Sequence, residues 1–359
     1  MGVVTGQFVR LTELSSGGGC ACKLPIGKLE GLLSGLAGTM APAEGDLLIG
    51  GLEGDDAAVL RLDADRALVL TTDFFTPIVD DPFDWGRIAA TNALSDVYAM
   101  GGRPILAVNV AAWPGETLPM EMLAEVIRGG AHVAGAVGCP VVGGHTVDDA
   151  VPKFGMCVLG LAHPDRLFAI DRLRVGDHLV LTKALGTGVI SSALKQQAAQ
   201  PASVSAAVTA MTTVNADACE AAHRVGVRAA TDVTGFGLVG HLHRMLVASG
   251  TAAEVFASEV PLLPGAVELV AAGHVPGGTQ ANIAHHVAAV DVDPSVPTEL
   301  AVLLHDAQTS GGLLLAVAGE AATEALVNDL RQQGHPAAAI GRVTGGAPGR
   351  IRVAQTAHR

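Results

Sequence analysis

The chain has 359 residues, of which 49% are hydrophobic and 16% are charged, a balance typical of a folded globular protein with room for about two domains. Its 22 basic and 35 acidic residues give a formal net charge of −13, which excludes the basic surface of a nucleic-acid-binding protein. Aromatic residues make up only 3%, so stacking platforms for single strands are scarce as well. A chain this acidic that acts on an anion needs a local cation, which points to a bound metal.

The five cysteines are an odd number and lack the spacing of a disulfide framework. This usage favours a reducing, cytoplasmic compartment. No apolar run approaches the roughly 18 residues that a membrane helix needs, and polar and glycine residues interrupt the N-terminus from Thr5 onward, where a signal peptide would have its apolar core. We therefore expect a cytoplasmic protein with no membrane partner.

The first feature in chain order is a thiol-bearing glycine loop. Three glycines, residues 17–19, precede Cys20, Cys22 and Lys23. The glycines leave the backbone nearly unrestrained, and a nearby ammonium favours the reactive thiolate form of a cysteine. This pattern predicts a mobile arm over residues 1–50 that carries a reactive group to a site built elsewhere. A glycine-rich leader with incidental cysteines is the alternative.

Two α/β domains are expected after the arm, over residues 51–165 and 175–355, joined by a linker rich in Pro, Asp and Arg. In the first domain, Asp84 is expected to cap a helix that Gly101 and Gly102 end. The apolar runs predict strands at 57–62, 67–72, 103–112, 139–142 and 154–162, and helices at 84–100 and 119–135. In the second domain they predict strands at 178–182, 229–232, 252–256, 311–317, 336–343 and 350–354, and helices from about 188, at 204–225, at 237–249 and at 320–333.

Carboxylates are the strongest chemical signal of the residues themselves. Asp55 and Asp56 precede an expected strand, whereas Asp73 and Asp232 each follow one. Such positions face a shared crevice in many α/β folds. Asp96 lies within the helix at 84–100, on a small-residue surface where a polar group faces either solvent or a ligand. Mg²⁺ prefers a few carboxylates together with phosphates and water, so these residues predict a magnesium site. For any single Asp, a cap or turn role is the alternative.

Three glycine-containing turns are candidates for binding phosphate. The segment 231–237 places a carboxylate, two hydroxyls and two glycines at a strand-to-helix turn. Gly143, Gly144, His145 and Thr146 follow a Val-rich strand, where the two glycines permit close approach of the backbone and the exposed N–H groups would suit an anion. The glycines at 186 and 188 could do the same, but an ordinary helix entry is the preferred interpretation.

Metal chemistry on softer ligands is not indicated. The thirteen histidines lack the spacing of a zinc helix, and Cys20 with Cys22 falls short of the four ligands of a structural zinc site. Cys139, Cys157 and Cys219 lie in apolar segments and are expected to pack in the core.

Taken together, the motifs resemble the selenophosphate synthetase (selenide, water dikinase) family over residues 9–353. The segments that carry the likeness are 10–12, 19–23, 55–59, 71–75, 92–102, 143–145, 231–237 and 308–313. The resemblance implies the two-domain α/β fold of the aminoimidazole ribonucleotide synthetases, which share the phosphate site but lack the Cys-x-Cys-Lys loop. It also implies a homodimer, with an interface in the apolar first half around 57–112.

The resemblance further implies an activity and a set of site residues. The family makes selenophosphate, AMP and orthophosphate from ATP, selenide and water, and a selenium-carrier protein is a possible source of the selenide. Cys20 and Lys23 would be catalytic, and Asp56, Asp96 and Asp232 would bind Mg²⁺. The implied contacts to ATP are Lys23, Glu53, Gly54, Asp55, Asp73, Asp96, Gly144, His145 and Thr146.

Two departures from the family pattern are Ala21, where a glycine is common, and Ser16, where a histidine is common. Two other functions remain as alternatives. One is another ATP-dependent synthetase of the same superfamily, which would not need the thiols. The other is a non-enzymatic carrier of selenium or a soft metal, which would not need three separated aspartates.

Overall fold

The structure is a computed structural model that describes residues 9–14, 17, 19, 32, 46–50 and 55–356. Most of the predicted arm, with Cys20, Cys22 and Lys23, lies outside the described residues, as do Glu53 and Gly54. The expected mobility of the arm therefore stays a prediction.

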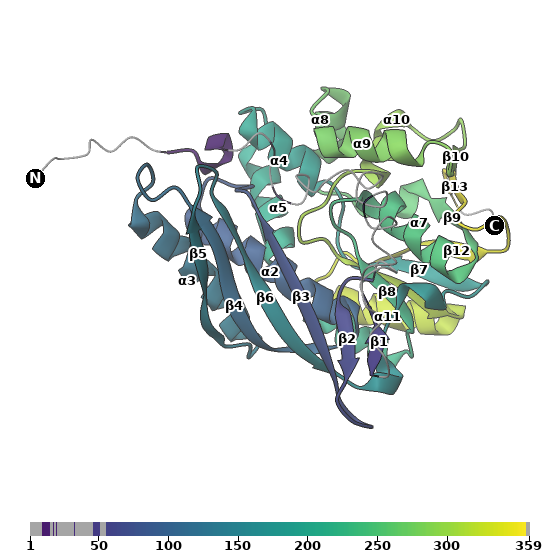
Figure 1. Ribbon diagram of the computed structural model, residues 1–359. Coiled ribbons are helices and arrows are strands. Elements are labelled where there is room, and N and C mark those ends of the chain that lie inside the picture. Colours follow the sequence, from purple (N-terminus) through teal and green to yellow (C-terminus); the bar gives the residue numbers. More distant parts are fainter. Residues whose placement is uncertain are drawn as a thin grey trace, which may run out of the picture.

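The first half is built on a six-stranded sheet in the order β1-β2-β3-β6-β4-β5. The strands are β1 (Leu47–Ile49), β2 (Ala58–Arg61), β3 (Ala67–Phe75), β4 (Arg103–Trp113), β5 (Val141–Asp148) and β6 (Lys153–Ala162). All neighbours are antiparallel except β4 and β5, which run parallel. Helices α2 (Pro82–Ala99) and α3 (Met120–Ala136) cover one face of the sheet (Figure 1).

Helix α2 is the central element of the molecule. Asp81, not Asp84, caps it, because the Asp81 side chain accepts a hydrogen bond from the Asp84 N–H and Pro82 supplies a preset first turn. The expected cap residue was therefore wrong by three positions. Gly101, with φ of +75°, ends the helix region as expected. A Cβ atom at Gly86 would lie 1.9 Å from the Val126 carbonyl oxygen, so this glycine lets α2 and α3 pack closely.

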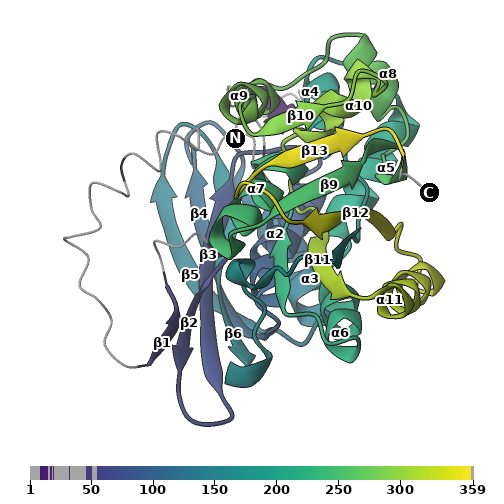
Figure 2. The ribbon, with the colours of Figure 1, turned by 90° about the vertical axis from the view of Figure 1, so that its right-hand side faces the viewer.

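The second half is built on a seven-stranded sheet in the order β10-β13-β9-β12-β7-β11-β8 (Figure 2). Its strands are β7 (Asp177–Leu181), β8 (Ala229–Asp232), β9 (Ala252–Phe256), β10 (Val290–Val292), β11 (Leu313–Ala318), β12 (Ala338–Thr344) and β13 (Ile351–Ala354). Its helices are α4 (Thr187–Lys195), α5 (Pro201–Thr212), α6 (Ala216–Arg224), α7 (Gly237–Ser249), α8 (Ala266–Ala271), α9 (Gly277–His286), α10 (Thr298–Leu304) and α11 (Glu320–Gln332). The sequence analysis missed α8, α9, β10 and α10.

The single helix predicted over 204–225 is wrong, because α5 and α6 are separate. The hydroxyls of Thr209, Thr212 and Thr213 each bond back to a carbonyl one turn earlier, which competes with a regular helix end. Asn215 then lies between the helices, and its side chain donates to the Ser95 hydroxyl (2.8 Å) and to the Gly311 carbonyl (3.0 Å). The break thus places a buried amide between the two halves.

The halves share one hydrophobic core. A single cluster of buried side chains includes Trp85 and Leu94 of α2 as well as Leu313 and Leu315 of β11. A second cluster, around Leu179 and Leu242, lies within the second half. The connecting segment contains two short 3₁₀ turns, η3 (Pro164–Arg166) and η4 (Ile170–Arg172). Burial of this extent fixes the halves against each other, so groups from both can form one site.

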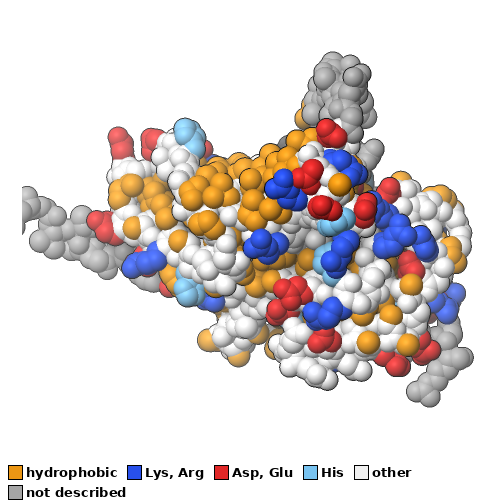
Figure 3. All heavy atoms as spheres, turned by 90° about the horizontal axis from the view of Figure 1, so that it is seen from below, with side chains coloured by type: hydrophobic (Ala, Val, Ile, Leu, Met, Phe, Trp, Pro, Cys, Tyr) orange, Lys and Arg blue, Asp and Glu red, His pale blue; other side chains and the backbone are white. Residues whose placement is uncertain are grey.

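The face of the six-stranded sheet opposite α2 and α3 is apolar and, among the described residues, exposed. Its outward side chains include Leu60, Leu70, Phe74, Val142 and Val147, each between 44% and 58% exposed. Hydrophobic side chains form a continuous band in the view from below (Figure 3). Within the described parts of the chain, every helix is too short or too polar to cross a membrane.

Candidate functional site

Three aspartates from separate elements form a carboxylate cluster. Asp56 lies just before β2, Asp96 lies on α2, and Asp232 is the last residue of β8. The sequence predicted this combination from both halves of the chain. Asp232 is 1% exposed, so its charge is almost entirely removed from solvent.

Asp56 is held through one of its carboxylate oxygens. Its Oδ1 accepts a hydrogen bond of 2.9 Å from the Thr231 hydroxyl. Its Oδ2 is buried and has no hydrogen-bond partner among the described residues. Burial raises the pKa of Asp56 well above its usual range, and the negative charge of Asp232 raises it further.

Asp96 experiences the same two effects. It accepts a hydrogen bond from the Thr71 hydroxyl on β3. Burial raises the pKa of Asp96 well above its usual range, and the charges of Asp232, Asp73 and Asp56 raise it further. The cluster therefore repels itself when fully ionised, and a cation bound between the carboxylates would relieve that repulsion.

The donor set of the cluster fits a hard divalent cation. Within the described ranges, no three His, Cys, Asp or Glu side chains lie close enough to bind one ion directly. Mg²⁺ usually retains several waters and uses only one or two carboxylates directly, so a partly water-mediated site suits these three aspartates. The buried Oδ2 of Asp56 supplies an oxygen ligand that the fold leaves without a partner.

Asp73 belongs to a second set of hydrogen bonds, which connects β3, α2 and the loop 306–312. The structure places Asp73 inside β3, so its expected position after the strand was wrong. Its Oδ2 accepts from the Asn92 side-chain amide (2.8 Å), and Asn92 Oδ1 accepts from the Ser310 N–H (2.8 Å). Asn92 is fully buried, so α2 directs it toward this site and not toward solvent.

The segment 231–237 forms the predicted strand-to-helix turn, with β8 ending at Asp232 and α7 beginning at Gly237. The Thr234 N–H donates to His241 Nε2 (3.1 Å), which fixes the turn against α7. Gly237 has φ of +70°, and a Cβ there would lie 2.7 Å from the His305 carbonyl oxygen. Only glycine fits this position without strain.

The loop 306–312 overlaps the segment 308–313 of the family likeness, but its contacts were not predicted. Gln308 Oε1 accepts from the backbone N–H groups of Gly186 (3.1 Å) and Thr187 (3.2 Å). Asp306 Oδ2 accepts from the N–H groups of Gly188 (3.1 Å) and Val189 (3.2 Å). Side chains of the protein therefore satisfy the start of α4, which confirms an ordinary helix entry at Gly186.

Sequence reasoning also missed Lys183, which lies just after β7. It is 3% exposed, and its Nζ donates to the Ser310 carbonyl (2.9 Å). Burial lowers the pKa of Lys183 to about 7, although the nearby charge of Asp232 opposes the shift. A lysine at the end of an apolar strand was the one signal in the sequence that could have found it.

Gly144, His145 and Thr146 lie within β5, so the expectation that they follow the strand was wrong. They pair with Asn109, Val110 and Ala111 of β4. Strands β6 and β4 stand between β3 and β5. Three strand spacings of about 4.8 Å put β5 roughly 14 Å from β3. Within one protomer, residues 144–146 therefore do not lie next to Asp73. Their contact with ATP stays a prediction.

The structure describes Gly19, the residue before Cys20. The Gly19 N–H donates to the Thr76 carbonyl (3.2 Å), close to the end of β3. A Cβ at Gly19 would lie 2.3 Å from the Thr309 hydroxyl, and its φ is +57°. The chain thus passes directly beside the loop 306–312 immediately before the first predicted catalytic residue.

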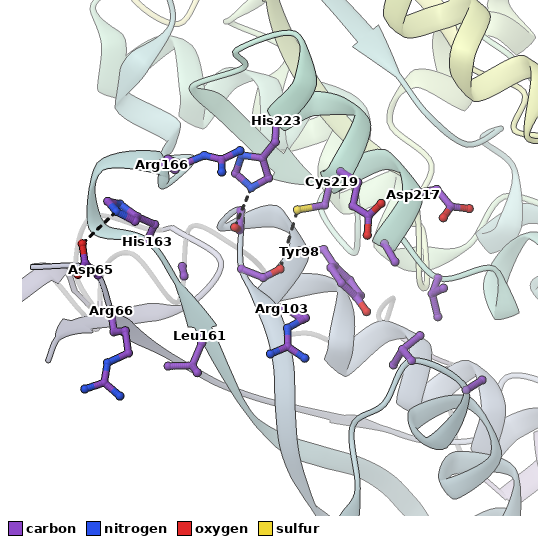
Figure 4. A pocket seen from close by; sticks show the side chains of 18 residues that line it. Asp65, Arg66, Tyr98, Arg103, Leu161, His163, Arg166, Asp217, Cys219 and His223 are labelled. Carbon is purple, nitrogen blue, oxygen red and sulfur yellow. Dashed lines mark hydrogen bonds and ion pairs between the residues drawn. The ribbon is translucent and has the colours of Figure 1, made fainter. Parts of the chain in front are cut away.

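A separate cavity of about 800 Å³ lies between the two halves (Figure 4). Its walls come from the end of α2, the start of β4, the end of β6 and α6, and Tyr98, Arg103, Arg166 and His223 are among its lining residues. None of the predicted site residues that the structure describes lines it. It is therefore distinct from the carboxylate cluster.

Sequence comparisons cover both halves. The sequence model "AIR synthase related protein, N-terminal domain" matches residues 54–162, and the corresponding C-terminal domain matches residues 174–354. A selenide, water dikinase from Burkholderia ambifaria is 45% identical, covering 96% of this chain and 97% of that protein. The selenide, water dikinase from Myxococcus xanthus is 44% identical, with 96% and 97% covered.

Comparison with solved structures supports the fold. Thiamine-monophosphate kinase from Stenotrophomonas maltophilia has a TM-score of 0.62 at 20% identity, covering 94% of this chain and 98% of that one. AaThiL complexed with AMPPCP and TMP has a TM-score of 0.63 at 17% identity, covering 94% and 97%. The predicted α/β fold of the aminoimidazole ribonucleotide synthetase type and the family resemblance are both confirmed.

Proposed function

Because the chain belongs to the selenide, water dikinase family, we propose that it converts ATP, selenide and water into selenophosphate, AMP and orthophosphate. Two phosphoanhydride bonds break in this reaction, with one phosphoryl group transferred to selenium and the other to water. The observation that carries the proposal is the carboxylate cluster contributed by both halves, in a chain that its relatives match along nearly its whole length.

The residues act mainly through electrostatics. Asp56, Asp96 and Asp232 would hold Mg²⁺, which when bound neutralises phosphate charge that would otherwise repel an anionic nucleophile. Asp232 is almost fully buried and Asp56 and Asp96 are half-buried, so charge interactions among them are stronger than in bulk water.

The remaining roles follow the family likeness. We assign ATP contacts to Lys23, Glu53, Gly54, Asp55, Asp73, Asp96 and residues 144–146. Asp55 is tied to the segment between the halves, since its Oδ1 accepts from the Ile170 N–H (2.9 Å). Cys20 would hold or deliver selenium, with Lys23 beside the phosphates. The position of Gly19 supports this, because Gly19 directly precedes Cys20 in the sequence and lies against Thr309 of the loop 306–312.

The direct test incubates the protein with Mg-ATP, with and without selenide, and follows ³¹P NMR. Selenide-dependent AMP and a new phosphorus–selenium resonance are expected. Turnover that requires a ribonucleotide instead would favour another synthetase of the superfamily, and selenium binding without ATP hydrolysis would favour a carrier. Asp232→Ala should weaken Mg-ATP binding and largely abolish turnover, and near-normal activity would remove Asp232 from the metal site.

The two thiols of the arm form a matched pair for a second test. Cys20→Ser should stop selenophosphate formation and leave Mg-ATP binding nearly intact, because the predicted phosphate contacts lie mostly elsewhere. Cys22→Ser should keep substantial activity. The opposite order of loss would exchange their roles.

We also propose a homodimer that buries the uncovered face of the six-stranded sheet. An apolar sheet face that stays exposed favours association. Phe74, which is 49% exposed on β3, lies on this face. Phe74→Glu should give a monomer in sedimentation equilibrium at micromolar concentration, whereas Val247→Glu, at an exposed position on α7, should not. A monomeric wild type would refute the dimer. The cysteine usage supports a cytoplasmic location, where a selenium-carrier protein could supply selenide.

A further inference from the structure

Ser310 combines two unusual features. Its backbone is left-handed, with φ of +50°, a conformation that side-chain-bearing residues rarely adopt. Its hydroxyl is buried and has no hydrogen-bond partner among the described residues, while the residue as a whole is 1% exposed. A strained backbone and an unsatisfied hydroxyl each cost stability, and such costs concentrate at functional sites.

The surroundings explain how the fold maintains this conformation. The Ser310 N–H donates to Asn92 Oδ1, and the Ser310 carbonyl accepts from Lys183 Nζ. On the following residue, the Gly311 carbonyl accepts from Asn215 Nδ2. A Cβ at Gly311 would lie 1.9 Å from the Val233 carbonyl oxygen, so the loop touches the residue after Asp232. Contacts on both sides thus fix the backbone of Ser310, and with it the position of its Cβ atom.

These contacts locate Ser310 between the predicted ATP contact Asp73 and the predicted metal ligand Asp232. On one side, Asn92 connects it to Asp73, a predicted ATP contact. On the other, Lys183 lies within electrostatic range of Asp232, a predicted metal ligand. Thr309, the neighbour of Ser310, contacts Gly19, which directly precedes Cys20 in the sequence. The Ser310 backbone is therefore one contact away from Asp73 and from Asp232, two residues assigned to Mg-ATP.

We infer that the Ser310 hydroxyl is a phosphate-binding group that donates its hydrogen bond to an anionic oxygen of the bound nucleotide. The inference rests on the proposed function for the identity of the nucleotide. It accounts for the unpartnered hydroxyl, because a phosphate oxygen would complete it. It also accounts for the left-handed backbone, which holds the hydroxyl in place before the ligand binds.

Two variants separate the hydroxyl from the backbone strain. Ser310→Ala removes the hydroxyl and keeps the strain, whereas Ser310→Gly removes both. Both should lower kcat/KM for ATP by roughly 10- to 100-fold, the effect of one hydrogen bond to a charged acceptor. Ser310→Gly should also melt at a higher temperature than Ser310→Ala, because glycine tolerates the left-handed conformation. Full activity in Ser310→Gly would show that the hydroxyl is not needed and would overturn the inference.

Two control positions carry the same features away from the site. Thr251 has a buried hydroxyl without a partner among the described residues, so Thr251→Ala controls for the loss of such a group. Gln197 has φ of +58° on the surface, so Gln197→Gly controls for the release of strain. Neither should change kcat/KM by more than about twofold.

Equilibrium binding distinguishes a phosphate contact from a general weakening of the site. In the full-length protein with Mg²⁺, Ser310→Ala should bind the non-hydrolysable analogue AMPPCP more weakly and bind adenosine as the wild type does. Equal loss for both ligands, or intact AMPPCP binding with a raised KM for selenide, would refute the phosphate assignment. Wild type without selenide-dependent AMP formation would refute the proposed function instead, and AMPPCP binding would still test Ser310.

Discussion

The carboxylate cluster should destabilise the protein when no cation is bound, and Asp56→Asn tests this directly. The amide keeps an Oδ1 that can accept from the Thr231 hydroxyl, but it removes one of the mutually repelling charges. Its Nδ2 takes the place of the buried Oδ2, near the charge of Asp232. Without a divalent cation, the variant should therefore be more stable than the wild type.

The expected gain is about 1–3 kcal/mol in the free energy of unfolding. One unit of pKa shift corresponds to about 1.4 kcal/mol, and partial solvent access to Asp56 keeps the gain below the limit for full burial. For a chain of 359 residues, we expect the melting temperature in EDTA to rise by roughly 1–4 °C. The direction in which stability changes with pH follows from the raised pKa of Asp56. The folded carboxyl takes up its proton at a higher pH than the unfolded one, so the wild type loses stability as pH rises through the folded pKa. The variant should lose less, because Asp96 still titrates.

Addition of Mg²⁺ should reverse the order, because the ion stabilises the wild type by binding and stabilises the variant less. Asp306→Asn is the matched control. Asp306 is also fully buried, and burial raises its pKa to about 6, but donors contact both of its oxygens. An amide there turns one acceptor into a donor, so this variant should lose about 1–3 kcal/mol with or without Mg²⁺. A less stable Asp56→Asn in EDTA, or a gain that Mg²⁺ leaves unchanged, would refute the reasoning.

Three further predictions concern the framework around the site. Burial lowers the pKa of His286 to about 4, so the unfolded state binds more protons than the folded state between pH 6.5 and 4. The free energy of unfolding of the wild type should therefore fall by up to about 3 kcal/mol on acidification through that window. In urea denaturation His286→Gln should show a smaller dependence of stability on pH, and the same dependence as the wild type would contradict the prediction. Asn215→Ala should cost about 1–3 kcal/mol in urea denaturation, because it leaves two buried groups without their donor, and a change below 0.5 kcal/mol would argue against that contact. Gly86→Ala should lower the melting temperature, since its Cβ would meet the Val126 carbonyl, whereas Gly135→Ala on the same helix pair has free space and should raise it slightly; similar shifts for both would show that α2 and α3 pack less tightly than described.

Sequence periodicity predicted the regular elements well where each helix or strand has a continuous apolar face. Strand β8 and helix α7 were predicted at their observed bounds, because an apolar strand, a glycine turn and a long amphipathic segment follow one another there. The prediction failed where side chains act over short distances. Helices α5 and α6 were merged, since their alanine-rich composition continues across a break made by threonine hydroxyls and by Asn215.

The carboxylates could be predicted because their residue type alone limits their chemistry. The groups that hold them could not be predicted, since their partners are far apart in sequence. The Ser310 N–H and Asn92 are separated by 218 residues, and Thr231 and Asp56 by 175. An asparagine on a helix or a threonine in a strand has an ordinary local role that sequence cannot distinguish from these contacts.

The junction of the two halves contains polar groups whose burial costs stability. Helix α2 presents Asn92, Ser95 and Asp96 to the junction of the halves, so this junction buries polar groups where an apolar contact would be more stable. Contacts within the chain satisfy Asn92 and Ser95, whereas Asp56 and Ser310 each keep an unpartnered buried oxygen among the described residues. A polar network completed by a ligand makes folding stability depend on that ligand. Mg-ATP should therefore tighten the junction of the two halves as well as occupy it, which couples nucleotide binding to the geometry of the loop 306–312 that contacts Gly19.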